Sequence, residues 1–246
     1  MTKNGFTEFE LCLKKYFNNS TKICFLNTIK DFSKDFFDNY TRINFRDNPD
    51  GYLKIGSKII IIEHFEYDAT KNNKKGSETR IEKSRINRKL DDKCYSLDNV
   101  KYAHEEMNVT HSTEQLRDNF IKIFSDHNSK INQYKKALIE DDIIDDNDEV
   151  IFMFCCEDKT IFGCLGIEDQ IYSFNILNIK ECLDVILESK IDYLLLCNSY
   201  QNRKEMKLAP VSKQLLEISA YSLASEIKMI DFKPKMYTAR INLPHM

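Results

Sequence analysis

Tryptophan is absent from this sequence of 246 residues, and glycine and proline are scarce, with 6 and 4 residues. Without a Pro- or Gly-rich linker, the sequence predicts a single domain over 1–246, a length that can bury a sizeable core. No apolar segment follows Met1, which argues against a secretory signal. The longest apolar runs, residues 59–62 and 193–197, are too short to span a bilayer. We therefore expect a cytoplasmic protein without a membrane partner.

An excess of positive charge is also missing, because the net charge is −3. The protein therefore has no overall positive potential that would indicate nucleic-acid binding, and any such binding requires a local basic patch. The sequence has eight cysteines but no CxxC pair, and the cysteines lie among apolar residues. This pattern favours reduced, buried thiols over disulfides or a zinc site. Hydrophobic residues at 42% and charged residues at 30% are typical of a folded protein and exclude an intrinsically disordered one.

Hydrophobic periodicity predicts the order of the elements. Helical spacing changes to strand-like patterns after Tyr40, and Ser112-x-x-Gln115 resembles a capping box that opens a long helix. The sequence thus predicts an α/β (α+β) fold with a mixed central sheet flanked by helices. The predicted strands are 42–45, 51–55, 58–67, 150–155, 191–197 and 236–242. The predicted helices are 6–17, 21–37, 113–139, 179–189 and 212–226, with a hairpin-like segment over 160–174.

The pair Asp50 and Glu63 is the chemically suggestive feature of the sequence. Ile55-Gly56-Ser57-Lys58 predicts a two-residue hairpin turn with glycine in the first place, as a type II′ turn requires. Cross-strand partners then have numbers that add to 113, which sets Asp50 opposite Glu63. Two facing carboxylates repel unless a positive charge lies between them, and a divalent cation such as Mg²⁺ suits them. The alternative is a purely structural hairpin with solvated charges at its open end.

Asn48-Pro49-Asp50-Gly51-Tyr52, with Glu63 at the end of an apolar strand thirteen residues after Asp50, resembles the PD-(D/E)xK nuclease superfamily. The predicted order over 6–156, helix, three antiparallel strands, helix and strand, is similar to the core of that superfamily. The resemblance implies a restriction-endonuclease-like core over 1–156, with a basic excursion at 70–111 and a C-terminal α/β extension of the sheet over 157–246. It also implies a Mg²⁺- or Mn²⁺-dependent nuclease that hydrolyses phosphodiester bonds, with Asp50 and Glu63 as catalytic metal ligands.

One position departs from the superfamily pattern. The superfamily has a lysine two residues after the second acid that helps to position and activate the attacking water, and this chain has Phe65 there. Lys75, in the polar segment after the strand, and Lys136, on the long helix, are our candidates to replace it. If neither does, the alternative is a catalytically inactive nuclease fold that binds nucleic acid or protein. A third possibility is an unrelated α/β interaction protein in which the hairpin is only structural.

A second metal hypothesis uses the other face of the same strand. Because side chains alternate along a strand, His64, Glu66 and Asp68 share the face that does not carry Glu63. These three side chains could ligate a metal themselves. A bulge near Phe65 could instead bring Glu66 beside Glu63 as a further ligand.

A basic segment separates the predicted strand 58–67 from the long helix. Residues 71–93 carry nine lysines and arginines against four acids and few large apolar groups, so we expect an exposed, mobile loop or helix. This segment would contact the phosphates of nucleic acid, with DNA preferred over RNA as the partner. The residues expected to bind it are Lys71, Lys74, Lys75, Arg80, Arg85 and Arg88.

Overall fold

The computed structural model describes residues 9–13, 36, 38–73, 76–96, 102–107, 109–160, 164–167, 170–173, 176–198, 209–212, 231–232 and 236–241. The chain divides into two compact units. Unit 1 consists of Met1–Tyr67 with Phe120–Ile227, and unit 2 of Asp68–Asn119 with Lys228–Met246. The two units therefore alternate along the chain, and the first segment of unit 2 contains the basic segment 71–93.

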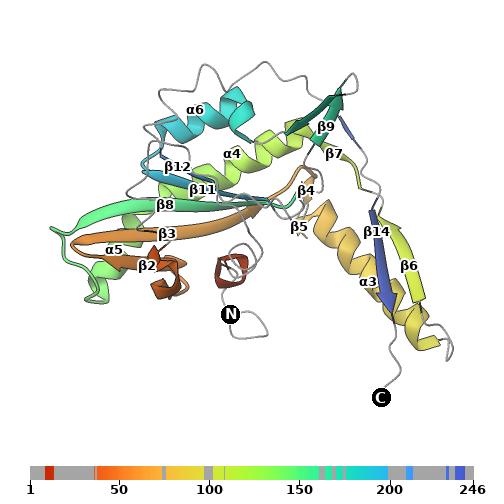
Figure 1. Ribbon diagram of the computed structural model, residues 1–246, viewed down its shortest axis with the longest axis horizontal. Helices are drawn as coiled ribbons and strands as arrows, with labels where there is room; N and C mark the ends of the chain where they lie inside the picture. The colour runs from red at the N-terminus through yellow and green to blue at the C-terminus, as the bar shows by residue number, and fades with distance from the viewer. Residues whose placement is uncertain are drawn as a thin grey trace. The chain divides into compact units, whose positions relative to one another are not determined.

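A six-stranded mixed sheet forms the centre of unit 1 (Figure 1). Its strand order is β1-β2-β3-β8-β11-β12, in which β3, β8 and β11 are parallel and the remaining pairs are antiparallel. The mixed α/β fold predicted from the sequence is confirmed. The strands are β1 Asn44–Phe45, β2 Gly51–Ile55, β3 Lys58–Tyr67, β8 Glu149–Asp158, β11 Tyr193–Asn198 and β12 Ala209–Ser212.

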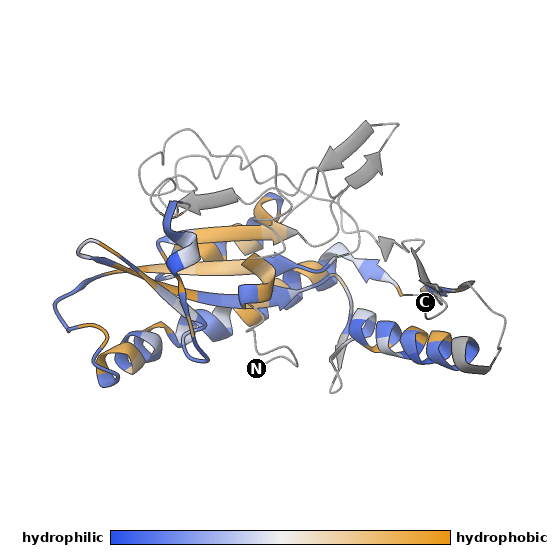
Figure 2. Cartoon of the chain, turned by 60° about the horizontal axis from the view of Figure 1, so that its bottom comes forward, coloured by the Kyte–Doolittle hydropathy of each residue, from blue (hydrophilic) through white to orange (hydrophobic). Residues whose placement is uncertain are grey.

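The central strands contain long apolar runs because both faces of the sheet are covered there. Each residue from 59 to 62 is at most 1% exposed, and the hydropathy colours of Figure 2 show the same apolar centre. One face packs on residues Phe9, Leu13 and Phe36 of the N-terminal segment. The other face carries an aromatic cluster in which β3 and β8 meet a long helix: Phe65, Phe120, Phe124 and Phe154.

The helix predicted over 113–139 is two helices, α4 Thr113–Ser129 and α5 Ile131–Glu140. Ser112 Oγ accepts the backbone N–H of Gln115 at 3.0 Å, which confirms the predicted N-cap. The break falls at Lys130, whose backbone carbonyl accepts the N–H groups of both Gln133 and Tyr134. Neither proline nor glycine lies at this break, so the sequence pattern continues across it without a signal.

The remaining elements of unit 1 include the predicted hairpin, formed by β9 Cys164–Ile167 and antiparallel β10 Gln170–Ser173. Helix α6 Lys180–Glu188 matches the predicted helix 179–189. The described residues also include two 3₁₀ turns, η1 Tyr40–Arg42 and η2 Ile176–Asn178. The predicted helix 212–226 and most of the predicted helices 6–17 and 21–37 lie outside the described residues.

The described residues of unit 2 include a helix and three short strand pairs. Helix α3, Glu78–Ser96, forms most of the basic segment and is one of the two forms expected for it. The predicted C-terminal strand is present as β14, but it pairs with β6 of unit 2 and does not extend the central sheet, so that part of the prediction is wrong. The strand pairs are β4 Asn72–Asn73 with β5 Gly76–Ser77, β6 Tyr102–Met107 with β14 Met236–Ile241, and β7 His111–Ser112 with β13 Asp231–Phe232.

None of the helices in the described part of the chain combines the length and the apolar character that a bilayer crossing requires.

Candidate functional site

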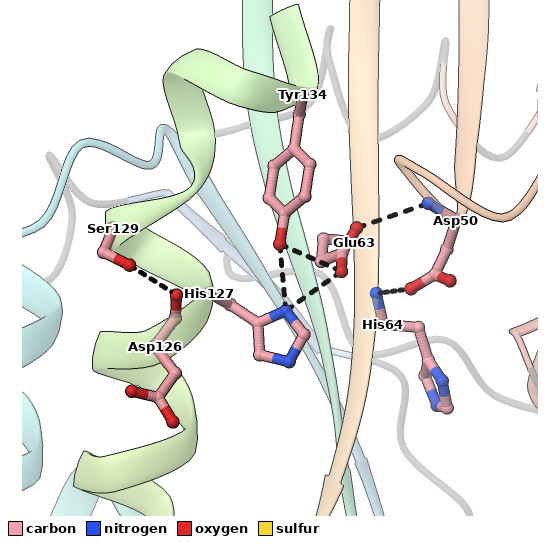
Figure 3. A network of polar contacts seen from close by, with 7 residues as sticks. All are labelled: Asp50, Glu63, His64, Asp126, His127, Ser129 and Tyr134. Atoms are coloured by element: carbon pink, nitrogen blue, oxygen red, sulfur yellow. Dashed lines mark hydrogen bonds and ion pairs between the residues drawn. The ribbon is translucent and has the colours of Figure 1, made fainter. Parts of the chain in front are cut away.

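The β2–β3 hairpin has the register predicted from the sequence. Ile55 pairs with Lys58, and the ladder continues to the pair of Gly51 with Ile62. Gly56 adopts a φ of 60°, a conformation that the first position of a type II′ turn requires and that glycine adopts without strain. The acid just before β2 therefore lies next to the acid that follows Ile62 (Figure 3).

Asp50 and Glu63 close the end of the ladder between β2 and β3. Oδ2 of Asp50 accepts the backbone N–H of His64 at 2.7 Å, and the N–H of Asp50 donates to Oε2 of Glu63 at 3.3 Å. Burial and then the charge of Glu63 raise the pKa of Asp50 to about 6, against the lowering effect of the His64 N–H. The two carboxylates therefore interact unfavourably when both are ionised.

Two side chains from α4 and α5 hold the Glu63 carboxylate. The Tyr134 hydroxyl donates to Oε1 of Glu63 at 3.1 Å, and Nδ1 of His127 lies 2.9 Å from the same oxygen (Figure 3). Burial raises the pKa of Tyr134, and so do the charge and hydrogen bond of Glu63, which keeps the phenol protonated. Because carboxylate oxygens only accept, Nδ1 of His127 carries the proton, and Nε2 has the lone pair when the ring is neutral.

Phe65 stands where the superfamily has its lysine. Its side chain is 5% exposed, and its ring stacks on His127 with centroids 5.1 Å apart and an interplanar angle of 17°. It also contacts the aromatic cluster on that face of the sheet. An ammonium group in this apolar setting would lose its hydration without gaining a partner. The basic group that reaches Glu63 is therefore the imidazole of His127.

The sequence analysis missed His127 and Tyr134. A signal for them was available, because the two residues are seven positions apart and share a helical face with Phe120 and Phe124. Lys136, the candidate on the same helix, is instead exposed and forms an ion pair with Glu140 at 3.4 Å between Nζ and Oε1. Its position two residues after Tyr134 places it on another side of α5.

Lys75 is the remaining lysine candidate. Lys75 lies outside the described residues, so its relation to Asp50 and Glu63 stays untested. Among the residues that the structure describes, no lysine forms an ion pair with either acid.

Glu66 is not a partner of the Asp50–Glu63 pair. The ladder between β3 and β8 is unbroken from Lys58 to Tyr67, so the bulge hypothesis is wrong and Glu66 faces the other side of the sheet from Glu63. There Nζ of Lys159 lies 3.0 Å from Oε1 of Glu66 and 2.6 Å from Oε1 of Glu157. A lysine thus offsets part of the negative charge of the carboxylates on that face.

The proposed set of His64, Glu66 and Asp68 is not formed as predicted. Strand β3 ends at Tyr67, and Asp68 begins unit 2, where its Oδ1 accepts the N–H and the hydroxyl of Thr70. The third acid that lies close to His64 and Glu66 is Glu157 of β8. Glu157 of the neighbouring strand β8 therefore takes the place expected for Asp68, and the sequence pattern does not show which strands are neighbours.

A hollow of about 590 Å³ opens beside the hairpin. Its walls include Arg46 and Asn48, just before Asp50, and Tyr52, just after it. Asp50 and Glu63 are not among its lining residues. The hollow therefore offers polar groups next to the acid pair without enclosing the pair itself.

The residues expected to bind nucleic acid belong to unit 2. Lys71, Arg80, Arg85 and Arg88 are all exposed. Arg85 forms a bidentate ion pair with Glu82 within α3. Lys74 and Lys75 lie outside the described residues.

Comparisons of the chain with protein-family models, curated proteins and solved structures give no match.

Proposed function

We propose that Asp50 and Glu63 bind Mg²⁺ or Mn²⁺ and that the chain is a diverged PD-(D/E)xK nuclease that hydrolyses phosphodiester bonds of nucleic acid. The observation that carries this proposal is the position of Asp50 beside Glu63 at the end of the β2–β3 ladder, where the N–H of Asp50 donates to Oε2 of Glu63. Burial, and then the charge of Glu63, raise the pKa of Asp50 to about 6. A divalent cation beside both carboxylates would remove their repulsion and favour the ionised forms.

The oxygens left over at the pair fit a hard cation. Oε1 of Glu63 already accepts a hydrogen bond from Tyr134 and lies 2.9 Å from Nδ1 of His127, whereas Oε2 accepts the backbone N–H of Asp50 at the longer distance of 3.3 Å. Oδ2 of Asp50 accepts the His64 N–H, so Oδ1 is the oxygen that remains to bind a cation. One oxygen from each carboxylate is the protein share that Mg²⁺ takes when water and phosphate oxygens complete its shell. A bound cation would supply Lewis acidity toward the phosphate and toward water.

His127 is our candidate for the role of the missing lysine. Glu63 accepts from Nδ1 and so fixes the orientation and tautomer of the ring. Nε2 is then free to accept a proton from an attacking water molecule, as in other carboxylate–histidine pairs. Tyr134 supports the arrangement by donating to the same carboxylate oxygen.

A cleavage assay tests the proposal on the full chain. Single- and double-stranded DNA and RNA are incubated with Mg²⁺, with Mn²⁺ or with a chelator, and we expect cleavage only with a metal. Asp50→Asn and Glu63→Gln should each lower the rate at least about 100-fold, since each removes a metal ligand. His127→Asn should lower it by about 100-fold or more, the contribution of a general base.

The matched control is Glu149→Gln, which neutralises an exposed acid at the opposite end of the β3–β8 pair and should leave the rate unchanged. Absence of cleavage on every substrate, or cleavage that survives Asp50→Asn, would contradict the proposal.

Phe65 favours a second candidate, a nuclease fold that binds nucleic acid or protein without cleaving it. Its burial against His127 leaves no room at the lysine position for a charged group. In that case the chain would bind nucleic acid in the presence of a chelator, and Asp50→Asn would not alter the affinity.

A further inference from the structure

A cluster of thiols and an imidazole lies on the sheet face opposite Glu63. The parallel register places His64 of β3 directly beside Cys155 of β8. The ligand atoms of Cys12, His64 and Cys155 all lie within 4.8 Å of one another. Sγ of Cys197, on the next strand β11, is 3.7 Å from Sγ of Cys155. Four potential metal ligands thus meet from four separate parts of the chain.

The cluster is sealed from solvent and contains an unsatisfied nitrogen. Cys12, Cys155 and Cys197 are at most 3% exposed, and so is the His64 side chain. Nε2 of His64 is buried and has no hydrogen-bond partner in the part of the chain that the structure describes, with Oε2 of Glu157 3.5 Å away. A buried nitrogen in this state destabilises the fold unless another group satisfies it.

We propose that Cys12, His64, Cys155 and Cys197 bind one Zn²⁺ ion in a closed structural site. Structural zinc is four-coordinate and tetrahedral, with sulfur at about 2.3 Å and nitrogen at about 2.0–2.1 Å. Two sulfurs on such an ion are about 3.8 Å apart, so Cys155 and Cys197 are already at the required separation. Cys12 and His64 lie within 4.8 Å of Cys155 and of each other, so binding requires these ligand atoms and Cys197 to close around the ion.

The charges around the cluster favour zinc at the thiols over a cation at the neighbouring acids. His64 also lies within 4.8 Å of Glu66 and Glu157, a second possible ligand group. Lys159 already contacts both of those carboxylates, at 3.0 Å and 2.6 Å, and offsets one of their two negative charges. No comparable charge reaches the thiols among the described residues. Thiolate ligands select zinc and other soft ions over Mg²⁺ and Mn²⁺, so this site is distinct from the Asp50–Glu63 pair.

Metal binding would change the protonation of the thiols. Burial raises the pKa of Cys155 and of Cys197, so both are neutral thiols in the metal-free core. On binding, Zn²⁺ displaces the protons of three thiols, which pass to solvent, and bonds to three thiolates and the neutral imidazole. The ion would tie the N-terminal segment that carries Cys12 to strands β3, β8 and β11.

Metal analysis of the full chain tests this proposal. After dialysis against Zn²⁺ and then against metal-free buffer, we expect one zinc ion per chain by mass spectrometry of the metal. Replacement by Co²⁺ should give thiolate-to-cobalt charge-transfer absorption in the near ultraviolet, which carboxylate ligands do not produce. Zinc should also slow the alkylation of these thiols in the wild type at least about 10-fold, a measurement that needs no substitution.

Cys155→Ala and Cys12→Ala should each lose the stoichiometric zinc and the cobalt band. The matched control is Cys156→Ala, since Cys156 is equally buried on the same strand but faces the other side of the sheet. It should retain both signals, as should Asp50→Asn. A wild type that holds less than a tenth of an equivalent of zinc, or a Cys155→Ala variant that keeps a full equivalent, would overturn the proposal and leave ordinary core thiols.

Discussion

Asp50 has two effects on the fold that oppose each other. Its Oδ2 satisfies the backbone N–H of His64 at 2.7 Å, whereas its charge is partly desolvated and lies beside Glu63. Asparagine would keep an acceptor for that N–H and remove the charge. If the unfavourable charge outweighs the hydrogen bond, Asp50 is placed as a metal ligand. If the hydrogen bond outweighs the charge, Asp50 is a structural cap.

We predict that Asp50→Asn stabilises the metal-free protein at pH 7 by about 1–2 kcal/mol. The rise of the Asp50 pKa from 3.8 to about 6 corresponds to about 3 kcal/mol, which solvent screening reduces. Well below pH 3.8 the carboxyl is protonated in both the folded and the unfolded state, so wild type and variant should differ little. The penalty on the wild type should appear as the pH rises from about 4 to about 6. Urea unfolding in the presence of a chelator, at several pH values, measures the difference.

The stability of the same variant should not respond to Mg²⁺ or Mn²⁺. Mg²⁺ or Mn²⁺ at a hundredfold excess over its Kd should stabilise the wild type by about 2.7 kcal/mol and leave Asp50→Asn unchanged. If Asp50→Asn is instead less stable than the wild type at pH 7, the carboxylate serves mainly to cap the His64 N–H.

The sequence was sufficient to place Asp50 beside Glu63, because a two-residue turn fixes the register of a hairpin by counting. It was not sufficient to place His127 or Glu157. His127 reaches Glu63 through the packing of α4 on the sheet, and Glu157 reaches His64 through a parallel strand about 90 residues later. Contacts of this kind depend on tertiary structure that local patterns do not encode.

Among the elements, the β2–β3 hairpin depends most on a single position. A side chain at Gly56 would meet no heavy atom within 4 Å, so only its backbone conformation, with φ at +60°, resists substitution. We predict that Gly56→Ala lowers the free energy of unfolding by about 1–2 kcal/mol. Gly56→Asn should cost less, because asparagine tolerates a positive φ. Chemical denaturation of the two variants provides the comparison, and equal stabilities would contradict this account of the turn.

Other element boundaries had no signal in the sequence. The apolar spacing that predicts one helix over 113–139 continues through Lys130, where the backbone breaks it into α4 and α5. On either side of this break, His127 of α4 and Tyr134 of α5 contact the same carboxylate. Strand β6 was not predicted either, because its sequence Tyr-Ala-His-Glu-Glu-Met does not alternate between apolar and polar residues.

For the whole molecule, the net charge of −3 makes any contact with nucleic acid depend on a local surface. Helix α3 offers one in Arg80 and Arg88, which are exposed and form no ion pair with the described residues. We predict that the double variant Arg80→Glu/Arg88→Glu weakens DNA binding at least about 10-fold at low salt. The slope of log K against log salt should become shallower by about 2.

Fluorescence anisotropy over a salt series measures both quantities. The control is Lys54→Glu/Lys58→Glu, which makes the same change in net charge at two exposed positions of the β2–β3 hairpin. Equal losses of affinity in the two double variants would mean that binding responds to net charge and not to α3.

The ends of the strand order β1-β2-β3-β8-β11-β12 bear on self-association. Outer strands with long rows of unpaired N–H and C=O groups recruit further chains into ordered aggregates. In the described part of the sheet, β1 has only two residues, and β12 contains Pro210, which has no N–H to donate. Neither end presents a continuous template for another strand. The architecture therefore disfavours edge-to-edge polymerisation, although its central strands are among the most apolar segments of the chain.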